Sequence, residues 1–243
     1  MSKKNRADDR ASRAAAAIEA QRRQETRRRN LMVGGVVAGL VVIVLLGWLI
    51  TRSLDTSADV DAPAAGSEFG LTIGPADAAN KVVVYEDFLC PFCADFEAAT
   101  RDDLQQLAAD GQVQVEYRPF NFLSGLGDYS ARSAGAFSIV LDTSGADVAK
   151  KFHDLLFENQ PEEQGPFPSD DDLADLAVEA GAADADVRDA IANNEGQDWV
   201  DRATQSADSA GVSGTPTILL NGEVFQDGRT VDELAENLIA KLQ

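Results

Sequence analysis

The two cysteines of this chain stand where a predicted strand meets a predicted helix. Cys90 and Cys93 are the only cysteines among its 243 residues. The β-branched run at 81–85 predicts a short buried strand, and residues 94–109 carry apolar side chains at helical spacing. Pro91 suits the first position of a helix, because its φ angle is already fixed and it has no N–H group to satisfy. We therefore expect Cys90 near the N-cap and Cys93 one turn inside the helix.

The beginning of a helix favours a thiolate over a thiol. Backbone N–H groups without partners and the positive end of the helix dipole stabilise an anion there. We expect Cys90 to be an exposed nucleophile with a lowered pKa, and Cys93 to be the buried thiol that resolves the mixed disulfide. Such a pair suits reversible thiol–disulfide exchange.

A metal site and a structural disulfide are the competing explanations of the cysteine pair. A zinc site would need four ligands, whereas the chain offers two cysteines and one histidine, His153. We therefore expect no metal and no other cofactor. A purely structural Cys90–Cys93 disulfide would close a short loop and constrain the unfolded chain little, but it stays open as an alternative.

A stretch without charges divides the chain into two parts of opposite charge. Residues 31–50 carry no charge and would span roughly 30 Å as a helix, which is one bilayer crossing. Residues 1–30 have a net charge of +6, and residues 51–243 have a net charge of −26. The arginines at 27–29 orient the N-terminus towards the cytoplasm. We expect a single-pass protein of the cell membrane with an extracytoplasmic C-terminal domain; a signal peptide cleaved near 62–64 is the alternative.

The segments around this predicted transmembrane helix have simple roles. Residues 1–30 are expected to form a basic cytoplasmic tail, and residues 51–66, rich in Ser, Thr, Asp and Ala, a flexible linker. The acidic domain that follows at 67–243 argues against nucleic acid as a partner, because phosphate contacts need Lys and Arg.

The sequence of the first half of this domain predicts an edge strand and then two strands joined by a helix. An edge strand is expected at 69–73, followed by the central strand at 81–85. After the helix that begins at Cys90, alternation of apolar and polar residues at 113–117 predicts another strand. The helix between them makes this a parallel crossover.

The second half predicts a helical block and a closing hairpin. Helical patterns fill residues 128–210, and Ser169 is expected to cap one of these helices. A strand at 217–220 turns at Asn221-Gly222 into a strand at 223–226. Thr230 with Glu233 predicts a capping box for a last helix.

Two motifs carry a resemblance to a known family. With Cys90-Pro91-Phe92-Cys93 opening a helix, and Gly214-Thr215-Pro216-Thr217 entering the late hairpin, residues 67–243 resemble the membrane-anchored, DsbA-like thiol:disulfide oxidoreductases of the thioredoxin superfamily. The resemblance implies an α/β thioredoxin fold with an inserted helical domain at about 128–210, preceded by a single N-terminal transmembrane helix.

The resemblance also implies site residues beside the two catalytic cysteines. Pro216 is expected to follow a cis peptide bond, and Thr215 to turn its N–H and C=O groups towards the cysteines, so that an extended substrate peptide adds there as a short strand. An ordinary trans turn at this proline is the alternative. Apolar contacts to unfolded substrate chains are expected from residues around the first cysteine: Phe88, Leu89, Pro91 and Phe92. Phe88, Leu89 and Phe92 would each suit a place in the core equally well.

The chain departs from the family pattern in two places. The dipeptide between the cysteines is Pro-Phe rather than the Pro-His of strongly oxidising members. Val84 occupies the position where many relatives carry a buried acid that assists proton transfer, and Glu86 and Asp87 are both open as replacements. His153 lies on a helix among apolar residues and is interpreted as a packing or surface residue outside the site.

The function that follows is a membrane-anchored thiol:disulfide oxidoreductase that forms disulfide bonds in secreted proteins. Its expected partners are reduced or unfolded secreted substrates, because disulfides persist outside the cytoplasm. The resemblance adds a membrane quinone-linked reoxidant of the DsbB or vitamin K epoxide reductase type. A disulfide reductase or isomerase for exported proteins and a non-enzymatic tethered binding domain are the alternatives.

Overall fold

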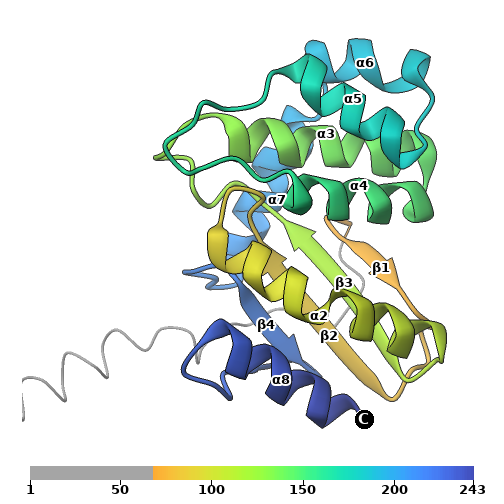
Figure 1. The fold of residues 1–243 in the computed structure, drawn as a ribbon, viewed down its shortest axis with the longest axis vertical. Helices are drawn as coiled ribbons and strands as arrows, with labels where there is room; N and C mark the ends of the chain where they lie inside the picture. The colour runs from red at the N-terminus through yellow and green to blue at the C-terminus, as the bar shows by residue number, and fades with distance from the viewer. Residues whose placement is uncertain (1–67) are drawn as a thin grey trace, which may run out of the picture. The chain divides into compact units, whose positions relative to one another are not determined.

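The computed structural model describes residues 68–243 (Figure 1). The predicted cytoplasmic tail, the predicted transmembrane helix and the predicted linker lie outside these residues. Among the residues described, no helix is both long enough and apolar enough to cross a membrane.

One sheet runs through the lower part of the domain in Figure 1, with its strands in the order β1-β3-β2-β4-β5. β2 and β3 are parallel, whereas β1 pairs antiparallel with β3, β4 with β2, and β5 with β4. The strands are β1 (Leu71–Ile73), β2 (Asn80–Glu86), β3 (Val113–Pro119), β4 (Thr217–Leu220) and β5 (Glu223–Val224).

Helices cover the sheet and form a separate block above it. α2 follows β2, α8 packs beside α2, and the block between β3 and β4 is entirely helical (Figure 1). The thioredoxin fold with a helical insertion is thereby confirmed. The helices are α2 (Pro91–Ala109), α3 (Tyr129–Ser144), α4 (Ala146–Glu158), α5 (Asp170–Ala180), α6 (Asp184–Ala192), α7 (Gln197–Ser209) and α8 (Val231–Leu242).

The central strand β2 is apolar on both faces because both faces are covered. Val82 and Val84 belong to the main core, which includes the buried faces of α2 and α8. Val83 and Tyr85 point the other way, into a second core with small residues of α7 such as Ala203. Successive side chains of a strand alternate between faces, so the run at 82–85 can be apolar throughout.

The predicted turn and helix caps are largely present. Asn221 and Gly222 have φ angles of 55° and 89°, as a tight hairpin turn requires. Ser169 caps α5 in a complete capping box. Thr230 accepts the N–H of Glu233, but the Glu233 carboxylate accepts the N–H of Arg229 instead of that of Thr230. The capping box predicted for α8 is therefore only half right.

Asp87 joins the cysteine loop to the helical block. Its side chain is fully buried. One carboxylate oxygen accepts hydrogen bonds from the N–H of Leu89 at 2.8 Å and the hydroxyl of Ser130 at 2.7 Å. The other accepts the N–H groups of Phe122 and Leu123, each at 2.8 Å. The hydrogen bonds of Asp87 thus hold three segments together. Asp87 is therefore not available as the acid that assists proton transfer, a role for which the sequence left both Glu86 and Asp87 open.

We expect Asp87→Asn to lower the free energy of unfolding by roughly 2–4 kcal/mol, because an amide nitrogen would face buried donors that now have an acceptor. Asp95→Asn removes the same charge from an exposed position of α2 and should change stability by less than about 0.5 kcal/mol. Denaturant unfolding of both variants measures this. Equal stabilities of the two variants would contradict the role given to Asp87.

Candidate active site

Cys90 is the N-cap residue of α2. Its backbone is extended, with φ −75° and ψ 116°, and Pro91 is the first residue of the helix. The Cys90 carbonyl oxygen accepts the N–H groups of Cys93 at 3.0 Å and Ala94 at 3.2 Å. The predicted placement of the pair, with Cys93 in the first turn, is confirmed.

Both cysteines are free thiols, and both are buried. The exposed fraction is 4% for Cys90 and 1% for Cys93. The prediction that Cys90 is exposed is therefore wrong. The segment before β4 lies against it, with the carbonyl oxygen of Thr215 at 3.4 Å from the Cys90 sulfur.

The two thiols nevertheless differ in acidity, as predicted. A hydrogen bond from the Cys93 thiol is the main cause that lowers the pKa of Cys90 to about 7, against the opposing effect of burial. Backbone N–H groups of Phe92 and Cys93 act in the same direction with smaller effect. Burial raises the pKa of Cys93 well above its usual value. Near neutral pH, Cys90 is thus the nucleophile and Cys93 keeps its proton.

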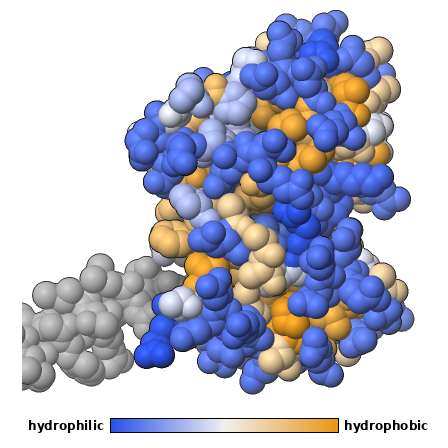
Figure 2. Space-filling model, viewed as in Figure 1, coloured by the Kyte–Doolittle hydropathy of each residue, from blue (hydrophilic) through white to orange (hydrophobic). Residues whose placement is uncertain are grey.

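A groove opens beside this pair. The Thr215–Pro216 peptide bond is cis, as the resemblance implied. Both residues line a groove of about 530 Å³, together with Phe92, the β4–β5 hairpin and the beginning of α8. Phe92 is 60% exposed, and Figure 2 shows hydrophobic residues reaching the surface at the level where α2 begins. The groove therefore offers an apolar rim and backbone polar groups to an extended peptide.

Two of the predicted substrate contacts belong to the core instead. Phe88 and Leu89 are 1% and 0% exposed, so the prediction that they contact substrate is wrong. The hydrogen bonds of Asp87 turn this loop inward, and the ring of Phe88 packs against that of Phe157 with centroids 5.1 Å apart. Pro91 and Phe92 are exposed and stay predicted contacts.

Gln160, which the sequence did not single out, supports the cysteine loop from the helical block. Its side-chain amide donates to the carbonyl oxygens of Phe88 and Cys90, each at 3.0 Å. A glutamine in a loop after α4 carries no signal in the sequence, because its partners lie about 70 residues away.

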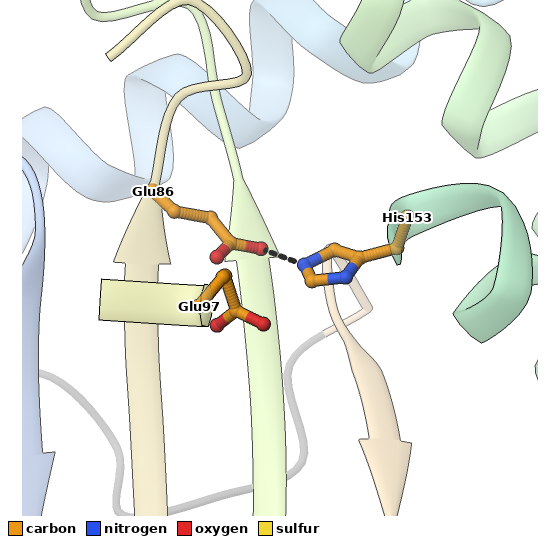
Figure 3. Close-up of side chains that lie close together, drawn as sticks. All are labelled: Glu86, Glu97 and His153. Carbon is orange, nitrogen blue, oxygen red and sulfur yellow. Dashed lines mark hydrogen bonds and ion pairs between the residues drawn. The ribbon is translucent and has the colours of Figure 1, made fainter. Parts of the chain in front are cut away.

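A cluster of buried ionisable side chains lies where the end of β2 faces α2 and α4 (Figure 3). Glu86 at the end of β2, Glu97 on α2 and His153 on α4 are each at most 1% exposed. His153 Nε2 lies 2.7 Å from Glu86 Oε1, and His153 Nδ1 lies 3.1 Å from Asp154 Oδ1. His153 is packed in the core, as the sequence allowed, and its partner Glu86 comes from β2, 67 positions away.

The same side chains are the group of described residues that could hold a metal ion. The ligand atoms of Glu86, Glu97 and His153 lie within 4.8 Å of one another. Two carboxylates and an imidazole suit Zn²⁺ or a similar ion, but metal binding requires a deprotonated imidazole nitrogen. The Nε2 atom of His153 already makes a short hydrogen bond to Glu86. The arrangement is that of an ion pair.

The pKa values of the cluster follow from burial and from its mutual charges. Burial alone would lower the pKa of His153, but the negative charge of Glu86 and the hydrogen bonds to Asp154 and Glu86 raise it to about 9. Burial raises the pKa of Glu97 to about 7. Near neutral pH, His153 is therefore protonated and Glu97 is in the middle of its titration.

These shifts predict that raising the pH weakens the fold. Glu97 and His153 bind protons more tightly in the folded chain, so their stabilising contributions are complete below the ordinary pKa values of 4.5 and 6.5 and are lost as pH rises through about 7 and about 9. We expect Glu97→Gln to remove a fall of roughly 3 kcal/mol between pH 4.5 and 7.

Unfolding of the disulfide form as a function of pH measures this without titrating the cysteines. Asp95→Asn, the exposed control on α2, should keep the fall. A Glu97→Gln profile parallel to that of the unchanged chain would contradict the shift assigned to Glu97.

The acidity of Cys90 should depend on the Cys93 thiol. In the reduced chain we expect alkylation of Cys90 to reach half its maximal rate near pH 7. Cys93→Ala removes the hydrogen-bond donor and should move this midpoint towards 9, whereas Cys93→Ser keeps a donor and should move it less. An unshifted midpoint in Cys93→Ala would instead assign the low pKa to the helix N–H groups alone.

Known proteins share this fold. Residues 67–240 match the family model described as Thioredoxin. The reduced structure of DsbA from Mycobacterium tuberculosis is 27% identical, with a TM-score of 0.61, and the match covers 72% of this chain and 90% of that one. Disulfide bond formation protein D of Bacillus subtilis is 25% identical over 173 residues, which make up 70% of this chain and 76% of that protein.

A larger protein also contains a similar segment. The Na(+)/H(+) antiporter NhaA 3 of Salinispora tropica is 29% identical over 170 residues, which are 67% of this chain and 23% of the antiporter. The chain thus spans less than a quarter of the length of this relative. The family match, in contrast, covers most of the chain described in Figure 1. The chain therefore belongs to the thioredoxin family, and residues 68–240 form a domain similar in structure to DsbA of Mycobacterium tuberculosis.

Proposed function

We propose that this protein is a membrane-anchored, extracytoplasmic thiol:disulfide oxidoreductase that forms disulfide bonds in secreted proteins through Cys90-Pro91-Phe92-Cys93. One observation carries the proposal: two thiols in one helical turn have pKa values shifted in opposite directions, at the edge of a groove. A structural pair needs no such difference. An exchange pair does, because one sulfur must attack or leave as a thiolate while the other waits as a thiol.

The reaction transfers two electrons from a substrate dithiol to the Cys90–Cys93 disulfide. A substrate thiolate attacks the sulfur of Cys90, which forms the mixed disulfide and releases Cys93. A second substrate thiolate then attacks the substrate sulfur, so that a substrate disulfide forms and Cys90 leaves as a thiolate. The lowered pKa of Cys90 makes it a good leaving group in this last step.

The groove positions the substrate for this attack. An extended peptide that pairs with the backbone of Thr215 passes the sulfur of Cys90, since the Thr215 carbonyl oxygen lies 3.4 Å from that sulfur. Pro91 and Phe92 at the beginning of α2 add apolar contact for unfolded chains. Main-chain pairing with few side-chain demands suits an enzyme that acts on many substrates.

The pair must be reoxidised after each cycle. A quinone-linked membrane protein of the DsbB or vitamin K epoxide reductase type would accept the two electrons. The charge-free segment 31–50, with its basic flank, would keep the domain near such a partner on the outer side of the membrane. The similarity to DsbA of Mycobacterium tuberculosis and to disulfide bond formation protein D of Bacillus subtilis supports the same direction.

One observation favours electron flow in the reverse direction as the second candidate. A pKa of about 7 for Cys90 equals that of thioredoxin, about 7, and lies well above that of DsbA, about 3.5. A less stabilised thiolate makes the disulfide a weaker oxidant. A reductase or isomerase for exported proteins is therefore the alternative function of the same site.

Trapping of intermediates in growing cells tests exchange with proteins. Cys93→Ala leaves the attack on Cys90 intact and removes the resolving thiol, so we expect mixed disulfides between Cys90 and other proteins to accumulate. Cys90→Ala should accumulate none. Diagonal gels of membrane fractions, run under non-reducing and then reducing conditions, display both outcomes and also show whether the full-length chain is membrane-bound.

Two results would count against the proposal. If Cys93→Ala forms no mixed disulfide in cells while the purified variant is folded, a binding domain with a structural disulfide explains the pair better. If the full-length chain appears only in the soluble fraction, membrane anchoring is wrong and the exchange chemistry stands by itself.

A further inference from the structure

The released Cys93 sulfur needs a proton, and its surroundings restrict where that proton comes from. Exchange at Cys90 turns Cys93 from a disulfide sulfur into a leaving thiolate and, in the reverse step, from a thiol into an attacking thiolate. Cys93 is 1% exposed, and burial disfavours its thiolate. Bulk water is therefore a poor source or acceptor of this proton, and a buried acid near Cys93 is better placed to exchange it. This reasoning rests on the proposed exchange function.

Two buried carboxyl groups flank Cys93. Glu97 follows it by one helical turn, so both side chains lie on the buried face of α2, where neighbours four apart have Cβ atoms about 5–6 Å from each other. Glu86 ends the strand that leads into the cysteine loop, and its negative charge acts on Cys93. Figure 3 shows the carboxyl groups of Glu86 and Glu97 side by side, with His153 facing the former.

These carboxyl groups have unused hydrogen-bonding capacity. Both oxygens of Glu97 and Oε2 of Glu86 are buried without a hydrogen-bond partner. Unpartnered buried oxygens of this kind are costly. A proton held between the two carboxyl groups relieves this cost, because a protonated carboxyl donates to its neighbour. A proton shared in this way would give the cluster one exchangeable proton in addition to those on His153.

The cluster also has a connection to the surface. His153 contacts Glu86 through Nε2 and Asp154 through Nδ1. The side chain of Asp154 is 15% exposed, and its Oδ1 also lies 2.5 Å from Lys150 Nζ and 3.4 Å from Arg101 Nε. An imidazole that bridges two carboxylates can pass a proton from one ring nitrogen to the other side.

We propose that Glu86, Glu97 and His153 form a proton path that serves Cys93, with Glu97 as the residue that holds the exchanged proton. When the Cys90–Cys93 bond breaks, the electron pair stays on Cys93, and the carboxyl proton moves to that sulfur directly or through one water. When Cys93 attacks, the proton returns to the carboxylate. His153 and Asp154 then exchange the proton between the carboxyl groups and the solvent. The path replaces the acid that is missing at Val84.

The charges that set this titration come from every element packed around Glu97. Neighbouring positive charge favours the ionised carboxylate, and neighbouring negative charge favours the protonated form. The groups are Glu86 on β2, Tyr117 on β3, and Lys150, His153 and Asp154 on α4.

Reduction of the Cys90–Cys93 disulfide by dithiothreitol tests the path without any protein substrate. The rate for the purified full chain, divided by the concentration of dithiothreitol thiolate, is measured from pH 5 to 9 by acid quenching and counting of thiols. We expect this rate to fall as pH rises through about 7, where Glu97 loses its proton. In Glu97→Gln the rate at pH 6 should drop about tenfold or more, and the profile should be flat.

Matched variants separate proton transfer from structure. Asp95→Asn removes an exposed charge from the same helix and should keep both the rate and the midpoint. Glu86→Gln removes a negative charge and should lower the midpoint, whereas His153→Gln removes a positive charge and should raise it. A merely structural cluster would change rates without moving the midpoint in opposite directions.

A profile that is independent of pH from 6 to 8 in the unchanged chain, or one that keeps its shape in Glu97→Gln, would overturn the path. Either result leaves the proposed function untouched if Cys93→Ala still traps proteins in cells. Conversely, a normal profile with no trapped proteins would retain the path and contradict the proposed function.

Discussion

The hydrogen bond between the two thiols at the beginning of α2 is the interaction on which the site depends. It is the main reason why the pKa of Cys90 falls to about 7, and it requires Cys93 to keep its proton in a place where burial favours the thiol. The same hydrogen bond also raises the pKa of Cys93, although burial is the larger cause there. The strand-to-helix junction at Pro91 fixes the geometry, because it sets both cysteines in the first turn.

The acidic residues around this junction have different structural roles. Asp87 accepts four hydrogen bonds that join the cysteine loop to the helical block. Glu86, one residue earlier and the last residue of β2, pairs with His153. Glu97 has no hydrogen-bond donor at all and titrates near neutral pH. The adjacent acids Glu86 and Asp87 thus have different roles, because Glu86 ends β2 whereas Asp87 begins the loop that follows.

The sequence predicted most of the fold and half of the site. Local patterns sufficed for β2, α2 and the Asn221-Gly222 turn, because each depends on neighbouring residues. Phe88 and Leu89 were misjudged because an apolar residue beside a cysteine suits the core and a binding surface equally well. His153 found its partner 67 positions away, which no pattern reveals. Glu97 did leave a signal: it is a charged residue on the apolar face of α2, four positions after Cys93.

The reduction potential of the Cys90–Cys93 pair tests most directly whether it is built for exchange. The purified full chain is equilibrated in glutathione buffers of known potential, and the thiol fraction is counted after acid quenching. A stabilised Cys90 thiolate predicts a potential between that of thioredoxin, about −270 mV, and that of DsbA, about −120 mV. A potential below about −300 mV, as structural disulfides have, would contradict the account.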